Sequence, residues 1–354
     1  MTKLRIYMVN TDEKYIHRCI ELAKLGAGSV APNPMVGAVV VRDNQIIGEG
    51  YHRVYGEPHA EVNAITSVKN KEWLKESTIY VSLEPCAHYG KTPPCAELII
   101  ASGIPRVVVG SGDPFAEVAG KGIEMLRAKG IEVKVGVLKE DCNELNKTFF
   151  TYHQKKRPFI YLKWAQTIDG YIDLDRSKPE LGQPTWISNE YARILVHKQR
   201  TEVDALLIGT NTAFKDNPSL TVRDWEGKQP LRMVIDRNNR LPEHLHLKDG
   251  ECQTIIFTAE NVPDSSLIKY VQLDFNSDII PQLMAWMYEN KVQSVVVEGG
   301  NLLLHSFIAA NLWDEAHVYI GNTWFGSGVK APDFNAFPQY TAQIQDTSLK
   351  VFKN

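Results

Sequence analysis

The stretch Pro85–Cys95, PCAHYGKTPPC, decides the fold of the first half of this chain once it is set beside His59-Ala60-Glu61 upstream. The imidazole of His59 and the thiolates of Cys86 and Cys95 make a three-ligand zinc set, which leaves the fourth tetrahedral position open to water. Zinc lowers the pKa of such a water to about 7, so hydroxide is available at neutral pH. The carboxylate of Glu61, beside the metal but not bound to it, can carry a proton to a leaving amine. The pattern therefore predicts a hydrolytic zinc site.

A purely structural zinc site is the competing interpretation of the same three ligands. Structural sites usually have four protein ligands, and a neighbouring acid would have no role in them. We therefore assign Glu61 as the catalytic residue and His59, Cys86 and Cys95 as the metal ligands, with the structural site as the alternative.

The segments around this site alternate between helix-like and strand-like patterns, which predicts a sheet covered by helices on its faces. In chain order we expect a helix over 12–25, strands over 35–42, 78–82 and 106–110, and helices around 61–67, 96–102 and 122–129.

The pattern changes between residues 147 and 158, where KTFFTYHQKKRP is basic, has no clear period and ends in proline. We place the boundary there, between a domain over 1–147 and a second over 158–354. A length of 354 residues also suits two domains. A second α/β series follows, with strands over 159–164, 205–209, 231–236, 254–258 and 293–298, a helix over 189–199 capped by Ser188, and a helix over 301–310.

The overall composition argues against several classes of protein. A net charge of -3 gives no reason to expect a surface that binds nucleic acid. The longest apolar runs are strand-sized and too short for a membrane span, and residues 1–30 carry charges where a signal peptide needs an apolar segment. Five scattered cysteines favour metal binding over disulfides, and they predict a cytoplasmic protein.

The first half resembles one branch of the zinc-dependent deaminases. The H-x-E and P-C pattern is typical of that class, but eight residues separate Cys86 from Cys95 where two are usual. With this longer loop the string 85–95 resembles the deaminase domain of bacterial riboflavin-biosynthesis enzymes, as do APNPMVG over 31–37 and Gly50-Tyr51-His52. The resemblance implies a cytidine-deaminase-like, three-layer αβα domain. It also implies substrate contacts, to the pyrimidine from Asn33 and His52 and to its ribose phosphate from His88 and Lys91.

The second half lacks the GxGxxG fingerprint of common dinucleotide-binding domains. From the residues alone it stays an unassigned α/β domain. Its most suggestive feature is the strand that enters the turn Gly299-Gly300 and then a helix. Such a turn allows close backbone approach to a phosphate, and it is equally consistent with a simple tight turn.

Three motifs of the second half resemble the reductase domain of the same riboflavin family, namely LKWAQTIDG over 162–170, WIS over 186–188 and GTNTAFKDNPSLTVR over 209–223. The resemblance implies a fold similar to dihydrofolate reductase and an NADPH cofactor. The residues implied for the cofactor are Ala165, Trp186, Thr212, Asp216, Gly299, Gly300, Asn301 and Leu302. Those implied for the substrate are Lys163, Arg200, Leu220, Arg223 and Glu298.

Two positions of the second half depart from the family pattern. Pro184 stands where serine is usual before the tryptophan motif, which puts one substrate hydrogen bond in doubt. Arg237 stands where serine is frequent in the cofactor site, and its charge leads to the hypothesis that it pairs with the 2′-phosphate of NADPH. The stretch after Gly328 carries few motifs and receives no function.

Together the resemblances imply a bifunctional enzyme of riboflavin biosynthesis, in a homodimer or larger assembly. It would deaminate 2,5-diamino-6-(5-phosphoribosylamino)pyrimidin-4(3H)-one with zinc, then reduce the ribosyl chain with NADPH to give 5-amino-6-(5-phosphoribitylamino)uracil. The main alternative is a deaminase whose reductase-like domain is catalytically inactive. A nucleic-acid-editing deaminase and a zinc-stabilised scaffold without activity are the other two alternatives.

Overall fold

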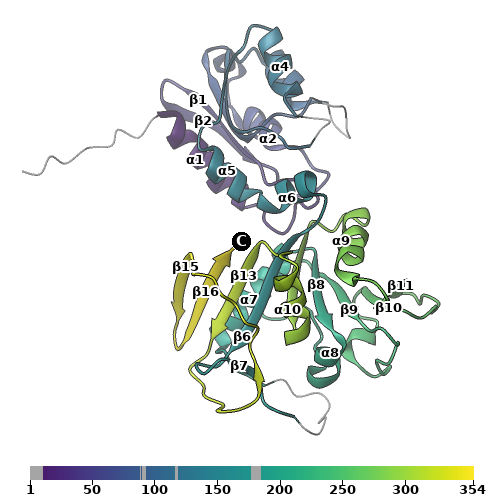
Figure 1. Ribbon diagram of the computed structural model, residues 1–354. Coiled ribbons are helices and arrows are strands. Elements are labelled where there is room, and N and C mark those ends of the chain that lie inside the picture. The colour runs from purple at the N-terminus through teal and green to yellow at the C-terminus, as the bar shows by residue number, and fades with distance from the viewer. Residues whose placement is uncertain (1–10, 88, 90–92, 116–118, 177–184) are drawn as a thin grey trace, which may run out of the picture. The chain divides into compact units, whose positions relative to one another are not determined.

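The computed structural model describes residues 11–87, 89, 93–115, 119–176 and 185–354. The chain divides into two compact units, Met1–Lys155 and Lys156–Asn354, which are described separately (Figure 1). The stretch in which we expected an irregular boundary is mostly helical, because α6 (Lys147–Lys155) occupies it and belongs to the first unit. No helix in the described part of the chain has the length and apolar character needed to cross a membrane.

The first unit is built on a five-stranded sheet with the order β2-β1-β3-β4-β5. Strand β1 pairs antiparallel with both β2 and β3, whereas β3, β4 and β5 are parallel. Its other elements, in chain order, are α1 (Thr11–Lys24), β1 (Gly37–Arg42), β2 (Gln45–Tyr51), α2 (Ala60–Ser67), the 3-10 helix η1 (Lys71–Glu76), β3 (Thr78–Leu83), α3 (Cys95–Ala101), β4 (Arg106–Ser111), α4 (Lys121–Ala128), β5 (Glu132–Val135) and α5 (Lys139–Leu145).

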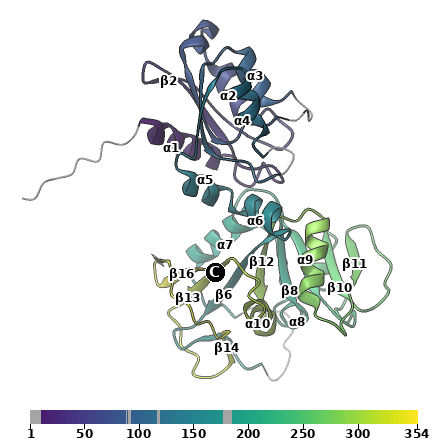
Figure 2. The same cartoon turned by 45° about the horizontal axis from the view of Figure 1, so that its top comes forward.

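Helices cover both faces of this sheet, which explains why its central strands are continuously apolar. Ala38 and Val40 of β1 pack beneath α2, α3 and α4, which lie together in Figure 2. Val39 and Val41 alternate with them and pack beneath α1 and α5 on the opposite face. The predicted three-layer αβα arrangement is confirmed.

An ion-pair network fastens the start of α1 to the sheet. The carboxylate of Asp12 accepts hydrogen bonds from Tyr80 Oη at 3.0 Å, Arg106 Nη2 at 3.1 Å and Lys134 Nζ at 2.7 Å. Burial alone would raise the pKa of Asp12, but the hydrogen bonds from Arg106, Lys134 and Tyr80 outweigh it and lower the pKa to about 2. The carboxylate therefore stabilises the folded unit wherever it is ionised.

We expect Asp12→Asn to lower the unfolding free energy of the first unit by about 2 kcal/mol at pH 7. Because the folded pKa lies below the ordinary value, this stabilisation is complete above about pH 4 and is lost as the pH falls towards 2. Urea titrations followed by circular dichroism between pH 7 and 2 measure the difference. The difference in unfolding free energy between the parent and Asp12→Asn should vanish near pH 2. Asp43→Asn, on an exposed loop, is the control, and its unfolding free energy should stay close to that of the parent at any pH. An Asp12→Asn protein as stable as the parent at pH 7 would contradict the prediction.

The second unit is built on a nine-stranded sheet with the order β11-β10-β9-β8-β12-β6-β13-β16-β15. The strands from β11 to β13 are parallel, and β16 and β15 extend the sheet in antiparallel pairing. Its elements are β6 (Phe159–Gln166), β7 (Tyr171–Asp173), α7 (Glu190–Glu202), β8 (Ala205–Gly209), α8 (Thr210–Asp216), β9 (Leu231–Ile235), the 3-10 helix η2 (His246–Lys248), β10 (Thr254–Thr258), β11 (Ile268–Gln272), α9 (Ile279–Glu289), β12 (Ser294–Gly299), α10 (Asn301–Ala309), β13 (Glu315–Ile320), β14 (Val329–Lys330), β15 (Tyr340–Ile344) and β16 (Thr347–Lys353).

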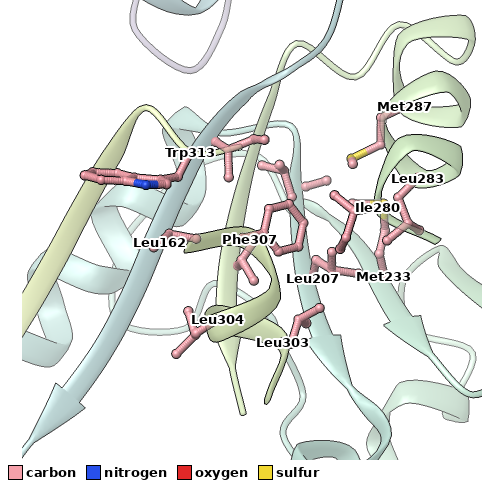
Figure 3. Close-up of a cluster of buried hydrophobic side chains, with 14 of the residues drawn as sticks. Leu162, Leu207, Met233, Ile280, Leu283, Met287, Leu303, Leu304, Phe307 and Trp313 are labelled. Atoms are coloured by element: carbon pink, nitrogen blue, oxygen red, sulfur yellow. The ribbon is translucent and has the colours of Figure 1, made fainter. Parts of the chain in front are cut away.

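One core of this unit lies between the sheet and helices α9 and α10, and a second, which includes Leu206, Ile208 and Val234, lies on the opposite face of the sheet. Figure 3 shows side chains of both helices directed at the strands, and the labelled members are Leu162, Leu207, Met233, Ile280, Leu283, Met287, Leu303, Leu304, Phe307 and Trp313. Helix α7 lies on the other face, because Ala192 and Val196 pack against Tyr319, whose neighbour Val318 faces the α9–α10 core.

The second unit differs from the sequence expectations in several places, since α8, β11, α9 and β13 were not expected. The N-cap of α7 is Asn189 and not Ser188, because the Asn189 side chain accepts a hydrogen bond from Ala192 N at 2.9 Å. The stretch after Gly328, which carried few motifs and received no function, supplies β14, β15 and β16, and β16 pairs along its length with β13.

Candidate active sites

Three side chains meet at the ends of elements in the first unit and form the predicted metal site. His59 is the N-cap of α2, Cys86 follows β3, and Cys95 is the first residue of α3. His59 Nδ1 lies 3.6 Å from Cys86 Sγ and 3.4 Å from Cys95 Sγ, and all three ligand atoms lie within 4.8 Å of one another. A tetrahedral zinc ion bound to one nitrogen and two sulfurs needs nitrogen–sulfur distances of about 3.5 Å. The donor set and its spacing therefore fit zinc.

Glu61 lies in the first turn of α2, and only 3% of its surface is exposed. Burial, and next the charge of Cys86, raise the pKa of Glu61 to about 7. The Cys95 thiol donates a hydrogen bond to Cys86, which lowers the pKa of Cys86 and raises that of Cys95. The site thus combines a sulfur that favours the ligating thiolate with a carboxyl group able to both accept and donate a proton near neutral pH.

Two of the predicted pyrimidine contacts lie next to the metal ligands. Asn33 Nδ2 lies 3.3 Å from His52 Nε2, and the His52 ring meets the His59 ring edge-on with centroids 5.3 Å apart. Burial lowers the pKa of His52, so its ring is neutral, with Nδ1 donating to the carbonyl of Pro58. The other two predicted contacts, His88 and Lys91, lie outside the described residues.

A buried carboxylate next to the metal ligands was missed by the sequence analysis. The oxygens of Glu84 accept hydrogen bonds from four backbone N–H groups at 3.0 to 3.3 Å, those of Asp113, Gly120, Gly122 and Ile123. Glu84 therefore binds the N-terminus of α4 to the strand end that leads into Cys86. A Cβ atom on Gly122 would lie 2.0 Å from the carbonyl oxygen of Pro85, so only glycine allows this close approach. The one signal in the sequence was the position of Glu84 directly before Pro85-Cys86.

The candidate residues of the second unit gather at one edge of its sheet. Strands β9, β8, β12 and β6 are adjacent and parallel, so their carboxyl ends lie side by side. That edge carries Ala165 at the end of β6, Gly209 at the end of β8, Arg237 just beyond β9, and Glu298 and Gly299 at the end of β12. Ligands of open α/β sheets bind at this edge.

The glycine turn after β12 lies close to the start of α8. A Cβ atom on Gly300 would lie 3.3 Å from Thr212 Oγ1, and no other described group comes nearer to it. Gly300 is the N-cap of α10, whose first residue Asn301 has a buried Oδ1 with no hydrogen-bond partner. A helix N-terminus and a turn without side chains fit a cofactor phosphate, and the unpaired Oδ1 of Asn301 can accept a hydrogen bond from a hydroxyl or amide group of the same cofactor. Leu302, next in α10, is 78% exposed.

A buried ion pair joins two of the predicted substrate residues. Arg200 Nη2 contacts both carboxylate oxygens of Glu298, at 3.0 and 2.9 Å, while Arg200 Nη1 donates to the carbonyl of Thr221. Burial alone would raise the pKa of Glu298, but the charges of Arg200 and Lys163 lower it to about 2. Burial lowers the pKa of Lys163, and the charge of Glu298 opposes this. The cluster holds two cations and one anion, which suits a phosphorylated ligand.

Arg176, which the sequence analysis did not single out, bonds the predicted cofactor residue Asp216 and the residue that precedes the predicted cofactor residue Trp186. Arg176 Nη2 donates to Asp216 at 3.1 Å and to Thr185 Oγ1 at 2.9 Å, and Thr185 directly precedes Trp186. Trp186 itself is 60% exposed and stacks with Arg193. Leu220, in contrast, is 2% exposed, and Pro184 lies outside the described residues.

Comparisons with known proteins assign both units. Residues 9–111 match the cytidine and deoxycytidylate deaminase zinc-binding region, and residues 158–354 match the RibD C-terminal domain. Riboflavin biosynthesis protein RibD from Bacillus amyloliquefaciens is 42% identical over 330 residues, which cover 91% of this chain and 87% of that protein. The chain belongs to the RibD family. Its relative RibD from Aquifex aeolicus is 40% identical, over 91% of this chain and 90% of its own length.

Solved RibD structures share the whole fold. A diaminohydroxyphosphoribosylaminopyrimidine deaminase/5-amino-6-(5-phosphoribosylamino)uracil reductase from Thermotoga maritima is 37% identical, with a TM-score of 0.87 over 97% of this chain and 98% of that one. RibD from Acinetobacter baumannii is 31% identical, with the same TM-score and coverage.

As a RibD protein the chain is a bifunctional enzyme of riboflavin biosynthesis, with a zinc-dependent deaminase domain and a reductase domain that uses NADPH. The expectation of a dihydrofolate-reductase-like second domain is confirmed. The comparisons give no support to a RibD protein with an inactive second domain.

Proposed function

We propose that the first domain removes ammonia from 2,5-diamino-6-(5-phosphoribosylamino)pyrimidin-4(3H)-one. The observation that carries this proposal is the triangle of His59, Cys86 and Cys95 with buried Glu61 beside it. When bound by these three ligands, zinc supplies a water of lowered pKa at neutral pH. Glu61 would accept a proton at its carboxylate and donate it to the leaving amine, for which a carboxyl pKa near 7 is well matched.

The substrate side of this site is formed by neutral polar groups. Asn33 and His52, hydrogen-bonded to each other, orient the pyrimidine ring next to Glu61. We assign the ribose phosphate to His88 and Lys91, on the sequence resemblance alone.

We propose that the second domain then reduces the ribosyl chain of the product to the ribityl chain. NADPH supplies the hydride, and the protein orients the two ligands. The phosphates of NADPH would be held by the Gly299-Gly300 turn, the start of α10 and Thr212. The cofactor site is completed by Ala165, Trp186, Asp216, Asn301 and Leu302. The phosphorylated substrate is held by Lys163, Arg200, Leu220, Arg223 and Glu298.

Parallel assays on the purified protein, of ammonia release and NADPH oxidation with the diaminopyrimidine ribotide, test both halves of the proposal. We expect both signals, in the order ammonia and then NADPH oxidation. Ammonia without NADPH oxidation would overturn the second half, and no ammonia from zinc-loaded protein would overturn the first.

Arg237 is the residue proposed to select NADPH over NADH. Its side chain is exposed just beyond β9, with the guanidinium 5.7 Å from the ring centroid of Phe275. A charged hydrogen bond to the 2′-phosphate contributes roughly 1.5–3 kcal/mol. We therefore expect Arg237→Ala to raise the KM for NADPH about 10-fold to 100-fold and leave the KM for NADH unchanged. Arg240→Ala, an exposed neighbour, is the control, and an unaltered NADPH preference in Arg237→Ala would refute the assignment.

We also propose a cytoplasmic enzyme that forms a homodimer or larger assembly. All five cysteines are free thiols, and two of them belong to the metal site, which suits a reducing compartment. Sedimentation analysis of the purified protein tests the assembly, and a monomer at micromolar concentration would refute it.

A further inference from the structure

The segment Thr221–Asp224 of the reductase domain belongs to no strand, and side chains bond four of its backbone polar groups. Arg200 Nη1 donates to the carbonyl of Thr221 at 3.0 Å. The side chain of Gln229 bonds both the N–H and the carbonyl of Val222, at 2.7 and 3.0 Å. His197 Nδ1 accepts from the N–H of Arg223 at 3.0 Å. The path of this segment is therefore set by side chains rather than by a β-ladder.

Three of the contacts to this segment come from one face of α7. Arg193, His197 and Arg200 are spaced by four and three residues, which places them on successive turns of the same side. Arg193 Nε donates to Asp224 Oδ2 at 2.8 Å, His197 accepts from Arg223, and Arg200 donates to Thr221. The helix thus holds the segment at three successive points.

His197 is the central and most buried of these three residues, with 2% of its surface exposed. Burial, and next the charge of Arg200, lower the pKa of His197 to about 4. The ring is therefore neutral, with Nδ1 as the acceptor for Arg223 and Nε2–H facing Asp224 Oδ2 at 3.5 Å. Asp224 is itself held by Arg193, whose guanidinium stacks on Trp186.

We propose that His197 is a positioning residue of the reductase, which fixes the backbone of Arg223 so that its exposed side chain is aimed at the substrate phosphate. The proposal rests on the proposed function, because it takes Arg223 as a phosphate contact. Loss of the Nδ1 acceptor removes the hydrogen bond of the Arg223 N–H and releases the middle of the segment from α7. Arg193 and Asp224 act in the same way from the end of the segment, and they connect it to Trp186 on the cofactor side.

Two substitutions separate the acceptor from the bulk of the ring. In His197→Asn the side-chain oxygen takes approximately the place of Nδ1 and keeps the bond to Arg223, whereas His197→Leu fills the space without an acceptor. We expect His197→Leu to raise the KM for the phosphorylated reductase substrate about tenfold, with kcat within about threefold of the parent. His197→Asn should stay within about threefold in KM. Ammonia release should be unchanged in both, and His244→Leu, an exposed site, serves as the control.

A substrate analogue without the phosphate gives a readout that a merely structural role would not change. Its KM should be the same in His197→Leu and in the parent, since Arg223 acts on the phosphate. Equal KM values of parent and His197→Leu for the phosphorylated substrate would overturn the proposal. Equal increases in KM in His197→Leu and His197→Asn would also overturn the proposal, because the effect would then come from the imidazole ring and not from its hydrogen-bond acceptor.

Calorimetric titration with ribose 5-phosphate keeps the test independent of turnover, and a Lys91→Ala background in every variant removes the proposed phosphate site of the first domain. A wild-type protein that oxidises no NADPH would refute the proposed reduction, while an about tenfold weaker Kd in His197→Leu would still support the positioning role. An unchanged Kd would refute it. If His197→Leu does not fold, Asp224→Asn takes its place, with an expected loss of about threefold in Kd, and no loss would count against the proposal.

Discussion

Glu61→Gln should abolish ammonia release, with a fall in kcat of at least about 1,000-fold and no loss of bound zinc. General acid–base catalysis contributes typically 10²-fold to 10⁴-fold, and in this site the same carboxyl group serves both proton transfers. Glutamine has nearly the same shape but can neither take nor deliver the proton. Because Glu61 is not among the three groups that meet at the metal site, zinc stoichiometry measured by atomic absorption should stay at that of the parent.

The reductase provides an internal control for this variant. When the deaminated intermediate is supplied as substrate, the rate of NADPH oxidation should be the same in the parent and in the Glu61→Gln protein, since Glu61 belongs to the first unit. Glu124→Gln, an exposed position on α4, should leave both activities intact. A Glu61→Gln enzyme that retains a tenth of the parental kcat would refute the proton-transfer role. Loss of zinc together with activity would instead make Glu61 a part of metal binding.

The zinc site was predictable because its ligands and its catalytic carboxylate lie in short local sequence motifs. His59 and Glu61 lie two residues apart, and each cysteine follows a proline, so ligand types and spacing sufficed. Glu84 adjoins the same motif and was missed. Its partners are backbone N–H groups between residues 113 and 123, and no side-chain pattern marks a backbone donor.

The second domain shows the limits of sequence analysis more clearly. Five of its seven parallel strands, β6, β8, β9, β10 and β12, were predictable as short apolar runs, whereas β11 and β13 were not. The pairing of β13 with β16 joins residues far apart in the chain, and no local signal encodes it. The structure places Arg193, His197 and Arg200 on one face of α7, whereas the sequence analysis expected only a helix over 189–199 and a substrate contact at Arg200. The contacts of these side chains could not be predicted. Residues 221–224 show no sequence periodicity, and they meet α7 only in the folded chain.

Glu298→Gln should have the largest effect on the reductase domain, because it removes the only anion of a buried three-charge cluster. Arg200 and Glu298 expose 10% and 11% of their side chains, and Lys163 lies close enough to lower the pKa of Glu298. Breaking a buried ion pair from one side leaves an uncompensated charge, and we expect the unfolding free energy of this unit to fall by about 3 kcal/mol. NADPH oxidation should fall at least 100-fold, which corresponds to about 2.7 kcal/mol in the reaction barrier.

The pH dependence distinguishes this loss from a simple packing defect. The folded pKa of Glu298 is about 2, below the ordinary 4.5, so its stabilisation is complete above about pH 4.5 and is lost as the pH falls towards 2. Parent and Glu298→Gln should therefore converge in acid. Tryptophan fluorescence reports this unit selectively, since six of the seven tryptophans lie in it and only Trp73 lies in the first. Glu289→Gln, exposed at the end of α9, should follow the parent at every pH. If the difference in unfolding free energy between the parent and Glu298→Gln persists unchanged down to pH 2, the effect comes from side-chain shape rather than charge. The ion pair would then have no part in holding Arg200 at the substrate site.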